Sequence, residues 1–293
     1  MNNKTAGILW VLVCVMLWGL IPVVARLGQA SLDNHQFLFW SSLISFIVLF
    51  FNAALAGEVR EVRSYLLADW AMIILLGLLG TYIYYLFLYL GYARAKGLEV
   101  LVIQYTWPII IVILSAFILK ESITFRKTIS IALGFLGVIV VLSKGEFSRI
   151  DVSNPSVILL VGAGAFCFAL FSVLSKKVKK SPTIVVSLYF LVALVASFLS
   201  MLYFSALKFP QFSDWFPITL NGLLVNGYSY IFWKKALRSA EASFIAPFVY
   251  IAPVISAIYL VFLFNEPFLM VYAIGLVLII LGGVINSRGT LVS

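Results

Sequence analysis

The stretch Gln104-Tyr105-Thr106-Trp107-Pro108 occupies the middle of an apolar run that carries no charge between Glu99 and Lys120. An apolar run of about 20 residues is long enough to cross a bilayer as a helix. We therefore predict a membrane-spanning helix over residues 98–119, with this polar and aromatic stretch near the middle of the membrane.

Pro108 interrupts the hydrogen-bond ladder of the predicted helix. Because proline has no N–H, the carbonyl of Gln104, four residues earlier, loses its helical partner. In the hydrocarbon region such a carbonyl needs a donor from protein, water or ligand. Tyr105 and Trp107 flank the break. The stretch is either a packing proline with two core aromatics or part of a binding site, and its recurrence later in the chain favours a site.

The composition indicates a polytopic membrane protein. The chain is 63% hydrophobic and 11% charged, whereas soluble domains average about 45–50% apolar and about 25% charged residues. The first five residues are polar and an apolar segment follows at once. We expect that segment to be retained rather than removed as a signal peptide.

The residue content argues against metal, cofactor and nucleic-acid chemistry. Cys14 and Cys167 lie inside apolar segments, as small core residues do, and His35 is the single histidine. The net charge of +9 comes from basic residues between the apolar segments, where membrane topology accounts for them. We expect no catalytic residues, no metal site, no cofactor and no nucleic-acid partner.

Hydropathy over a window of about 19 residues predicts ten membrane-spanning helices joined by short polar connections. The ten segments are residues 6–25, 34–56, 69–92, 98–119, 127–143, 156–175, 182–206, 215–236, 241–264 and 267–287. If the N-terminus is cytoplasmic, 14 of the 20 Lys and Arg residues lie on the cytoplasmic side. The positive-inside rule then places both termini of this inner (plasma) membrane protein in the cytoplasm.

The chain repeats itself. At an offset of 145 residues the matched pairs are Ala95–Ala240, Tyr105–Tyr250, Pro108–Pro253, Glu121–Glu266 and Gly137–Gly282; at an offset of 150 they are Trp18–Phe168, Pro22–Ser172 and Arg26–Lys176. The change of offset corresponds to a five-residue deletion, which we expect in a loop. Since five helices is an odd number, residues 1–150 and 151–293 form two oppositely oriented repeats. Secondary transporters with inverted repeats bind substrate between the halves near the midplane.

These landmarks resemble the EamA-domain branch of the drug/metabolite transporter superfamily over nearly the whole chain. They include Trp18-Gly19 in the first segment, Gly134 and Gly137 in the fifth, and the paired positions above. Residues Tyr105 to Pro108 resemble the fourth-helix signature of the YddG-type aromatic amino-acid exporters. The resemblance implies a central cavity lined by the first, third, fourth, sixth, eighth and ninth helices.

Candidate substrate-binding residues follow from this resemblance and from the polar pattern. They are Trp18, Tyr84, Tyr85, Gln104, Tyr105, Trp107, Phe168, Asn226, Tyr228 and Tyr250, with helix breaks at Pro108, Pro247 and Pro253. Leu88 stands where the family pattern suggests another aromatic residue. For Asn226 and Tyr228 the alternative role is hydrogen bonding between helices.

All eleven acidic residues lie at predicted helix ends or in loops. Carboxylates inside the membrane are the usual proton relays of coupled transporters, so the sequence shows no proton-coupling site. Glu121 and Glu266 are expected to cap or pair at helix ends.

The sequence thus predicts a carrier that exports small organic metabolites, in first place aromatic or other amino acids, by alternating access. A nucleoside-like metabolite, a drug or a lipid-linked substrate moved by a flippase is the alternative. An integral-membrane enzyme would need an acid–base or nucleophile–base constellation that is not evident, and a purely structural subunit would leave the matched helix breaks unexplained. The expected partners are a small-molecule substrate and membrane lipids, and the sequence is compatible with a monomer.

Overall fold

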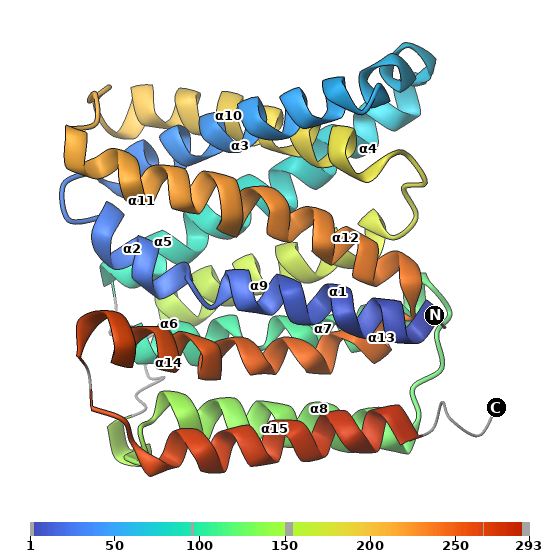
Figure 1. The fold of residues 1–293 in the computed structure, drawn as a ribbon, viewed down its shortest axis with the longest axis vertical. Coiled ribbons are helices and arrows are strands. Elements are labelled where there is room, and N and C mark those ends of the chain that lie inside the picture. The colour runs from blue at the N-terminus through green and yellow to red at the C-terminus, as the bar shows by residue number, and fades with distance from the viewer. Residues whose placement is uncertain (1–2, 95–96, 150–154, 266, 289–293) are drawn as a thin grey trace.

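Helices make up all the regular structure in the residues that the computed structural model describes, which are 3–94, 97–149, 155–265 and 267–288 (Figure 1). In the first half they are α1 (Asn3–Trp18), α2 (Ile21–Gly28), α3 (Asn34–Leu55), η1 (Glu58–Ser64), α4 (Leu67–Gly77), η2 (Leu78–Ile83), α5 (Tyr84–Arg94), α6 (Gly97–Gln104), α7 (Trp107–Ile118), α8 (Phe125–Leu142) and η3 (Phe147–Arg149). In the second half they are α9 (Pro155–Ser175), α10 (Pro182–Phe204), η4 (Phe212–Asp214), α11 (Trp215–Leu220), η5 (Asn221–Tyr228), α12 (Ser229–Ser239), α13 (Ala242–Ile245), η6 (Ala246–Ile251), α14 (Ala252–Phe264) and α15 (Met270–Arg288).

Nine helical segments among the described residues are long and apolar enough to cross a membrane. They coincide with nine of the ten predicted segments, and the chain is an all-α, multi-pass membrane protein. The remaining segment, residues 215–236, is helical through α11, η5 and α12 and packs against α1 and α3. Its asparagine, tyrosine and lysine side chains make it too polar to qualify by composition, although it lies among the other helices in Figure 1.

The prolines of the predicted breaks start helices. The α6 helix ends at Gln104, and α7 begins at Trp107 with Pro108 in its first turn. In the second half α14 begins at Ala252 with Pro253 in the same position. A proline is tolerated in the first turn of a helix, because the N–H that it lacks has no intrahelical partner there.

The helices of the two halves correspond at the offset found in the sequence. Helices α5 and α12, α7 and α14, and α8 and α15 begin 145 residues apart, at Tyr84 and Ser229, Trp107 and Ala252, and Phe125 and Met270. The π-helices η2 and η5 occupy corresponding places immediately before α5 and α12. Helices α3 and α10 begin 148 residues apart, and so do α4 and α11. Two residues of the change of offset therefore precede α3 and α10, and the other three fall between the starts of α4 and α5.

Corresponding helices also pack against each other at the two edges of the bundle. Helices α3 and α10 lie together at one edge and α8 and α15 at the other (Figure 1). A Cβ atom added to Gly137 would lie 2.7 Å from the carbonyl oxygen of Gly275, and one added to Gly282 would lie 2.8 Å from that of Ser130. Small residues allow this close approach of helix backbones in membranes.

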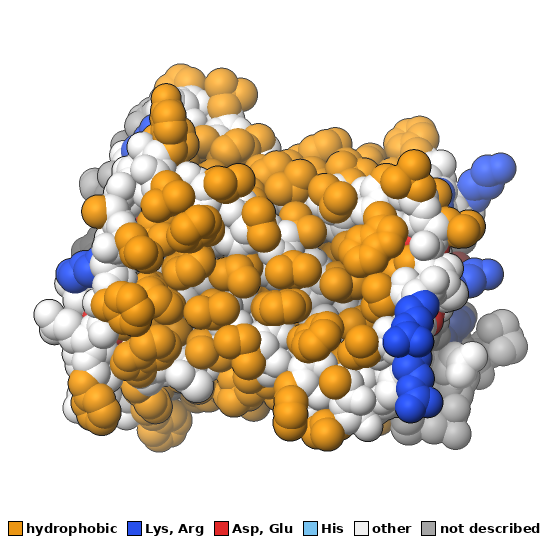
Figure 2. Space-filling model, turned by 90° about the horizontal axis from the view of Figure 1, so that it is seen from above, with side chains coloured by type: hydrophobic (Ala, Val, Ile, Leu, Met, Phe, Trp, Pro, Cys, Tyr) orange, Lys and Arg blue, Asp and Glu red, His pale blue; other side chains and the backbone are white. Residues whose placement is uncertain are grey.

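The outer surface matches a bilayer. Figure 2 shows hydrophobic side chains over most of one face, with Lys and Arg toward its ends. Large apolar side chains such as Phe51, Phe117 and Phe262 are exposed. In lipid these side chains need no protein cover, and aromatic and polar side chains are buried between the helices together with aliphatic ones.

Candidate functional site

An aromatic cluster lies where the helices of the two halves meet. Phe168 of α9 is at its centre, with ring centroids 4.6 Å from Tyr84, 4.9 Å from Trp107 and 5.9 Å from Trp18. Tyr85 packs against Tyr84 at 5.0 Å. These distances are typical of aromatic pairs that attract each other. Five of the predicted binding residues are therefore in one place.

Two further members of the cluster, Tyr230 and Trp233 of α12, were absent from the sequence prediction. Trp233 lies 5.4 Å from Trp18 and donates a hydrogen bond from Nε1 to Ser172 Oγ at 3.1 Å. Tyr230 donates from Oη to the carbonyl of Gly80, in the π-helix η2, at 2.9 Å. The repeat offset of 145 pairs them with Tyr85 and Leu88, so the aromatic residue missing at Leu88 occurs in the other half of the molecule.

The cluster forms the inner end of a cavity. A narrow part of about 20 Å³ is lined by Tyr84, Tyr85, Trp107 and Phe168, among others. It continues into a part of about 310 Å³ whose walls include Lys144, Pro253, Ser256 and Tyr272. Trp18, Ile21, Gln104 and Tyr105 line both parts.

Gln104 is the polar centre of this cavity. Its side chain is 5% exposed and donates from Nε2 to Tyr84 Oη at 2.6 Å. Its Oε1 atom is buried and accepts no hydrogen bond from the described part of the chain. Since buried polar atoms almost always have a partner, this unsatisfied acceptor is a candidate point of contact for a hydrogen-bond donor.

The other predicted residues lie elsewhere. Tyr250 packs against Phe135 and Gly134 of α8. Tyr228 accepts a hydrogen bond from Asn52 Nδ2 at 2.8 Å. This is the hydrogen bonding between helices that the sequence offered as the alternative to substrate binding. Asn226 is fully buried in η5, and its amide atoms have no partner among the described residues. Of the prolines, Pro253 lines the cavity, whereas Pro108 and Pro247 are buried at helix starts.

Polar contacts join the two halves of the chain at the end of the protein where α1 begins and α15 ends. Glu121 accepts the backbone N–H groups of Ala242 and Ser243, each at 2.9 Å, and pairs with Lys176 at 3.0 Å. Burial raises the pKa of Glu121, but the hydrogen bonds from Ser243 and Ala242 and the charge of Lys176 outweigh it and hold the pKa below its ordinary value. Glu121 thus caps a helix of the other half, as predicted; its repeat counterpart, Glu266, lies outside the described residues.

A second ion pair at this end joins the start of α8 to the residue before α13. Lys127, in the first turn of α8, contacts Glu241 Oε2 at 2.6 Å and Ser243 Oγ at 2.8 Å. The cavity lining includes Val141 and Lys144 at the opposite end of α8. Because a helix rises about 1.5 Å per residue, the ion pair and the cavity mouth are roughly 25 Å apart. One end of the protein is therefore sealed while the cavity opens toward the other.

A multi-pass helical bundle with a polar-centred cavity between its halves and a seal at one end defines a membrane transporter. The chain belongs to the EamA-like transporter family, which matches residues 5–143 and 155–288. It is a transporter and not an enzyme.

Relatives of this chain are named as transporters of different substrates. The chain is 27% identical over 267 residues to an S-adenosylmethionine uptake transporter of Rickettsia prowazekii, covering 89% of this chain and 85% of the relative. It is 26% identical over 187 residues to the aromatic amino acid exporter YddG of Ancylobacter novellus, covering 63% and 65%. A solved crystal structure shares the fold, with a TM-score of 0.86 at 20% identity, and covers 97% of this chain and 98% of that one.

Proposed function

We propose that this protein is an inner-membrane carrier for an amino-acid-like solute with a flat ring, in first place an aromatic amino acid that it exports. The observation that carries the proposal is the buried Gln104 Oε1 acceptor beside the aromatic cluster. An α-ammonium group would donate to this oxygen, while the substrate ring would stack on Trp18 or Tyr105. Lys144 also lines the main part of the cavity.

The size and polarity of the cavity fit this class of substrate. Small-molecule sites occupy about 300–1,000 Å³, and a main cavity of about 310 Å³ lies at the lower limit of that range. A single metabolite suits it better than a lipid-linked substrate. The lining within the described residues is mostly apolar and aromatic, with few polar groups to fix orientation.

We infer that transport is by alternating access in two inverted repeats, residues 1–150 and 151–293, with ten spans that include α11–η5–α12. The matching starts of corresponding helices support this architecture. The excess of Lys and Arg supports cytoplasmic termini. In that orientation the seal made by Glu121 and Lys176 is cytoplasmic, and the cavity faces outward.

A second candidate substrate is S-adenosylmethionine or a similar cationic nucleoside derivative. It is favoured by the long match to the uptake transporter and by the aromatic lining, since tryptophan and tyrosine faces attract cations. Such a substrate also carries a flat ring and an amino-acid group, so the same Gln104 acceptor would serve it.

Counterflow in proteoliposomes separates the two candidates. Vesicles are loaded with unlabelled tryptophan, and entry of labelled tryptophan is measured with an excess of phenylalanine, leucine or S-adenosylmethionine outside. We expect exchange that phenylalanine inhibits and leucine does not. Exchange driven by S-adenosylmethionine but not by tryptophan would transfer the proposal to the second candidate, and equal inhibition by leucine would contradict recognition of the ring.

A further inference from the structure

A pocket of about 330 Å³, here called the lysine pocket, lies beside the start of α4 and apart from the aromatic cluster. Its lining includes Met72 and Ile73 of α4 on one side, and residues 177–180, which connect α9 to α10, on the other. Lys176, the residue before this connection, pairs with Glu121 at 3.0 Å. The lysine pocket is therefore at the sealed end of the protein.

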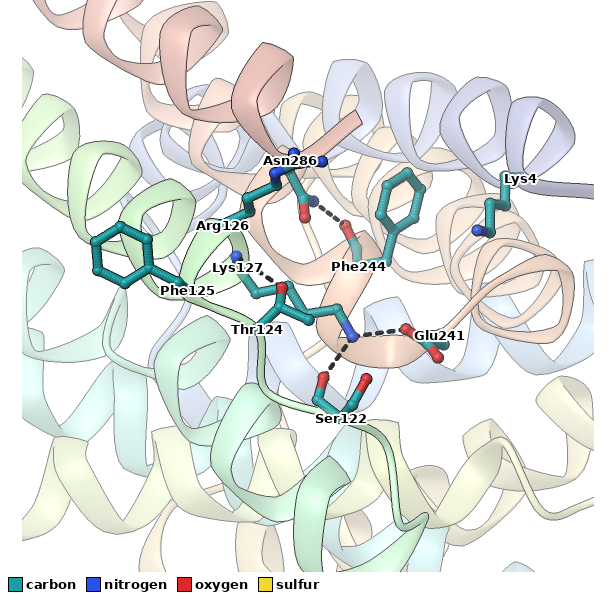
Figure 3. Close-up of a pocket in the computed structure, with 9 residues that line it drawn as sticks. All are labelled: Lys4, Ser122, Thr124, Phe125, Arg126, Lys127, Glu241, Phe244 and Asn286. Atoms are coloured by element: carbon teal, nitrogen blue, oxygen red, sulfur yellow. Dashed lines mark hydrogen bonds and ion pairs between the residues drawn. The ribbon is translucent and has the colours of Figure 1, made fainter. Parts of the chain in front are cut away.

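Other basic side chains at the sealed end are held by partners within the protein. Lys127 contacts Glu241 Oε2 at 2.6 Å and donates to the carbonyl of Ser122 at 2.7 Å (Figure 3). Lys234, in α12, donates to the carbonyl of Ser175 at the end of α9, at 3.0 Å. These charges serve contacts between helices.

The lysine pocket has two positive charges without such partners. The side chains of Lys177 and Lys179 are exposed, and their ammonium groups make no hydrogen bond or ion pair with the residues that the structure describes. Lys180, the third lysine of the lining, differs from them because its Nζ atom lies 3.2 Å from Asp69 Oδ2. Three positive charges and one negative charge give the lining a net charge of +2, which attracts anions.

The backbone that carries these lysines is fixed by contacts with other elements. Arg238 donates from Nη2 to the carbonyl of Val178, at 2.7 Å, and to that of Lys180. Glu61 accepts the N–H of Ser181 at 3.0 Å. A site whose backbone is already ordered loses less conformational entropy when a ligand binds. The lysine pocket is therefore preformed.

An apolar stripe leads from the pocket along α4. Ala68 and Met72 line the pocket, and Leu75 follows on the same face of the helix, seven and three residues further along. Leu75 is 44% exposed. A small soluble anion would leave this stripe uncovered, whereas the acyl chain of a lipid would lie on it.

The lysine pocket also lies at the depth of lipid headgroups. The membrane-spanning part of α9 ends at Ser175 and that of α10 begins at Pro182, so Lys177 and Lys179 follow one span and precede the next. Basic pockets between membrane helices bind anionic headgroups. We propose that the lysine pocket binds the phosphate group of an anionic membrane lipid, with Lys177 and Lys179 as its principal charges and an acyl chain on the apolar stripe of α4.

Native mass spectrometry of the full chain in detergent tests this site. The protein is titrated with phosphatidylglycerol, with phosphatidylcholine, and with phosphatidylglycerol in the presence of inorganic phosphate. The pocket variant is Lys177→Gln combined with Lys179→Gln, and Lys177→Arg combined with Lys179→Arg retains the charge. The matched control is Arg60→Gln combined with Arg63→Gln, which removes the same charge from exposed positions in η1, outside the pocket.

We expect saturable binding of phosphatidylglycerol that the pocket variant weakens, while the arginine variant and the control bind as the unmodified protein does. Each basic residue near an anionic surface contributes about fivefold in affinity, so the pocket variant should bind roughly 25-fold more weakly. Equal weakening in the control would show a diffuse charge effect and overturn the proposal. Equal binding of phosphatidylcholine would show that binding does not depend on the lipid's charge. Full displacement by millimolar inorganic phosphate would assign the pocket to a soluble anion instead.

Discussion

The carboxylate of Glu121, just beyond the end of α7, accepts the backbone N–H of Ser243 in α13 at 2.9 Å. The first N–H groups of a helix have no intrahelical partner, and here a side chain from the other half of the molecule satisfies two of them. The two halves are thus held together at one end by a contact that any opening of that end must break.

Glu121→Gln should make the sealed end open more often, because glutamine keeps the size of the side chain but loses its attraction to Lys176. Ser172 lies on α9, four residues after Phe168 and four before Lys176, which follows the end of the helix, and it is fully buried. In a background of Cys14→Ala and Cys167→Ala, Ser172→Cys reports opening through its rate of labelling by a polar maleimide. We expect faster labelling in Glu121→Gln than in Glu58→Gln, whose carboxylate caps α10 by accepting the N–H of Ile184. Equal rates in the two variants would show that Glu121 does not hold this end closed.

Acidification should imitate this substitution. A carboxyl group whose pKa is lowered in the closed structure contributes stability above its ordinary pKa and loses it as the pH falls through the lowered value. The pKa of Glu121 is lowered, so its contribution is complete at neutral pH and disappears in the acid range. Labelling should rise on acidification, after correction for thiol reactivity, and the rise should be absent in Glu121→Gln. A rise of equal size in both proteins would assign the effect to another group.

Gly137→Ala should destabilise the packing of α8 against α15. The added Cβ would lie 2.7 Å from the carbonyl oxygen of Gly275, which is closer than real Cβ contacts. Overpacking of this kind costs about 1–3 kcal/mol. Gly162→Ala is the control, because its Cβ would meet nothing nearer than 4.0 Å. Thermal unfolding in detergent should show a loss of stability for Gly137→Ala alone; similar midpoints for the two variants would contradict the close approach of these helices.

Trp107→Ala should lower stability as well as transport. Trp107 is 3% exposed and packs against Trp18, Phe168 and Trp233. Truncating a buried tryptophan costs about 3–5 kcal/mol in soluble cores. The substitution should therefore reduce the amount of folded protein in detergent, whereas Trp107→Phe should retain most of the packing. An alanine variant with unchanged thermal stability would show that the ring faces open cavity, as a pure binding residue would.

Transport should not depend on a proton gradient. The described residues that line the cavity include no carboxylate, and coupled carriers generally use carboxylates within the membrane to move protons. A pH step imposed across proteoliposomes should leave the final distribution of substrate unchanged. Accumulation of substrate against its gradient after such a step would contradict this prediction.

The sequence predicted the helix break at Pro108, the repeat and the meeting of Trp18, Tyr84, Tyr85, Trp107 and Phe168, because these depend on local chemistry and on resemblance. It did not predict the π-helices η2 and η5, whose extra residue per turn leaves no signature in hydropathy. Tyr250 was predicted to bind substrate because the repeat offset of 145 pairs it with Tyr105. The structure shows that Tyr105 lines the cavity while Tyr250 packs on Gly134, since a single conformation need not treat the equivalent residues of two halves alike. The presence of Tyr230 in the cluster could have been predicted from the sequence, because the offset of 145 pairs it with Tyr85. Trp233 lies one turn further along the same helix.

The affinity of the Gln104→Leu variant for substrate tests the central proposal most directly. Leucine has nearly the size of glutamine but cannot accept a hydrogen bond. A hydrogen bond from a charged donor contributes about 1.5–3 kcal/mol of free energy. Gln36→Leu is the matched control, since Gln36 is also buried and hydrogen-bonded, to the carbonyl of Ala206, but lies outside the cavity. With both variants folded, counterflow should show roughly a tenfold to hundredfold weaker apparent affinity for Gln104→Leu and an unchanged value for Gln36→Leu. An unchanged affinity in folded Gln104→Leu would show that the substrate binds elsewhere.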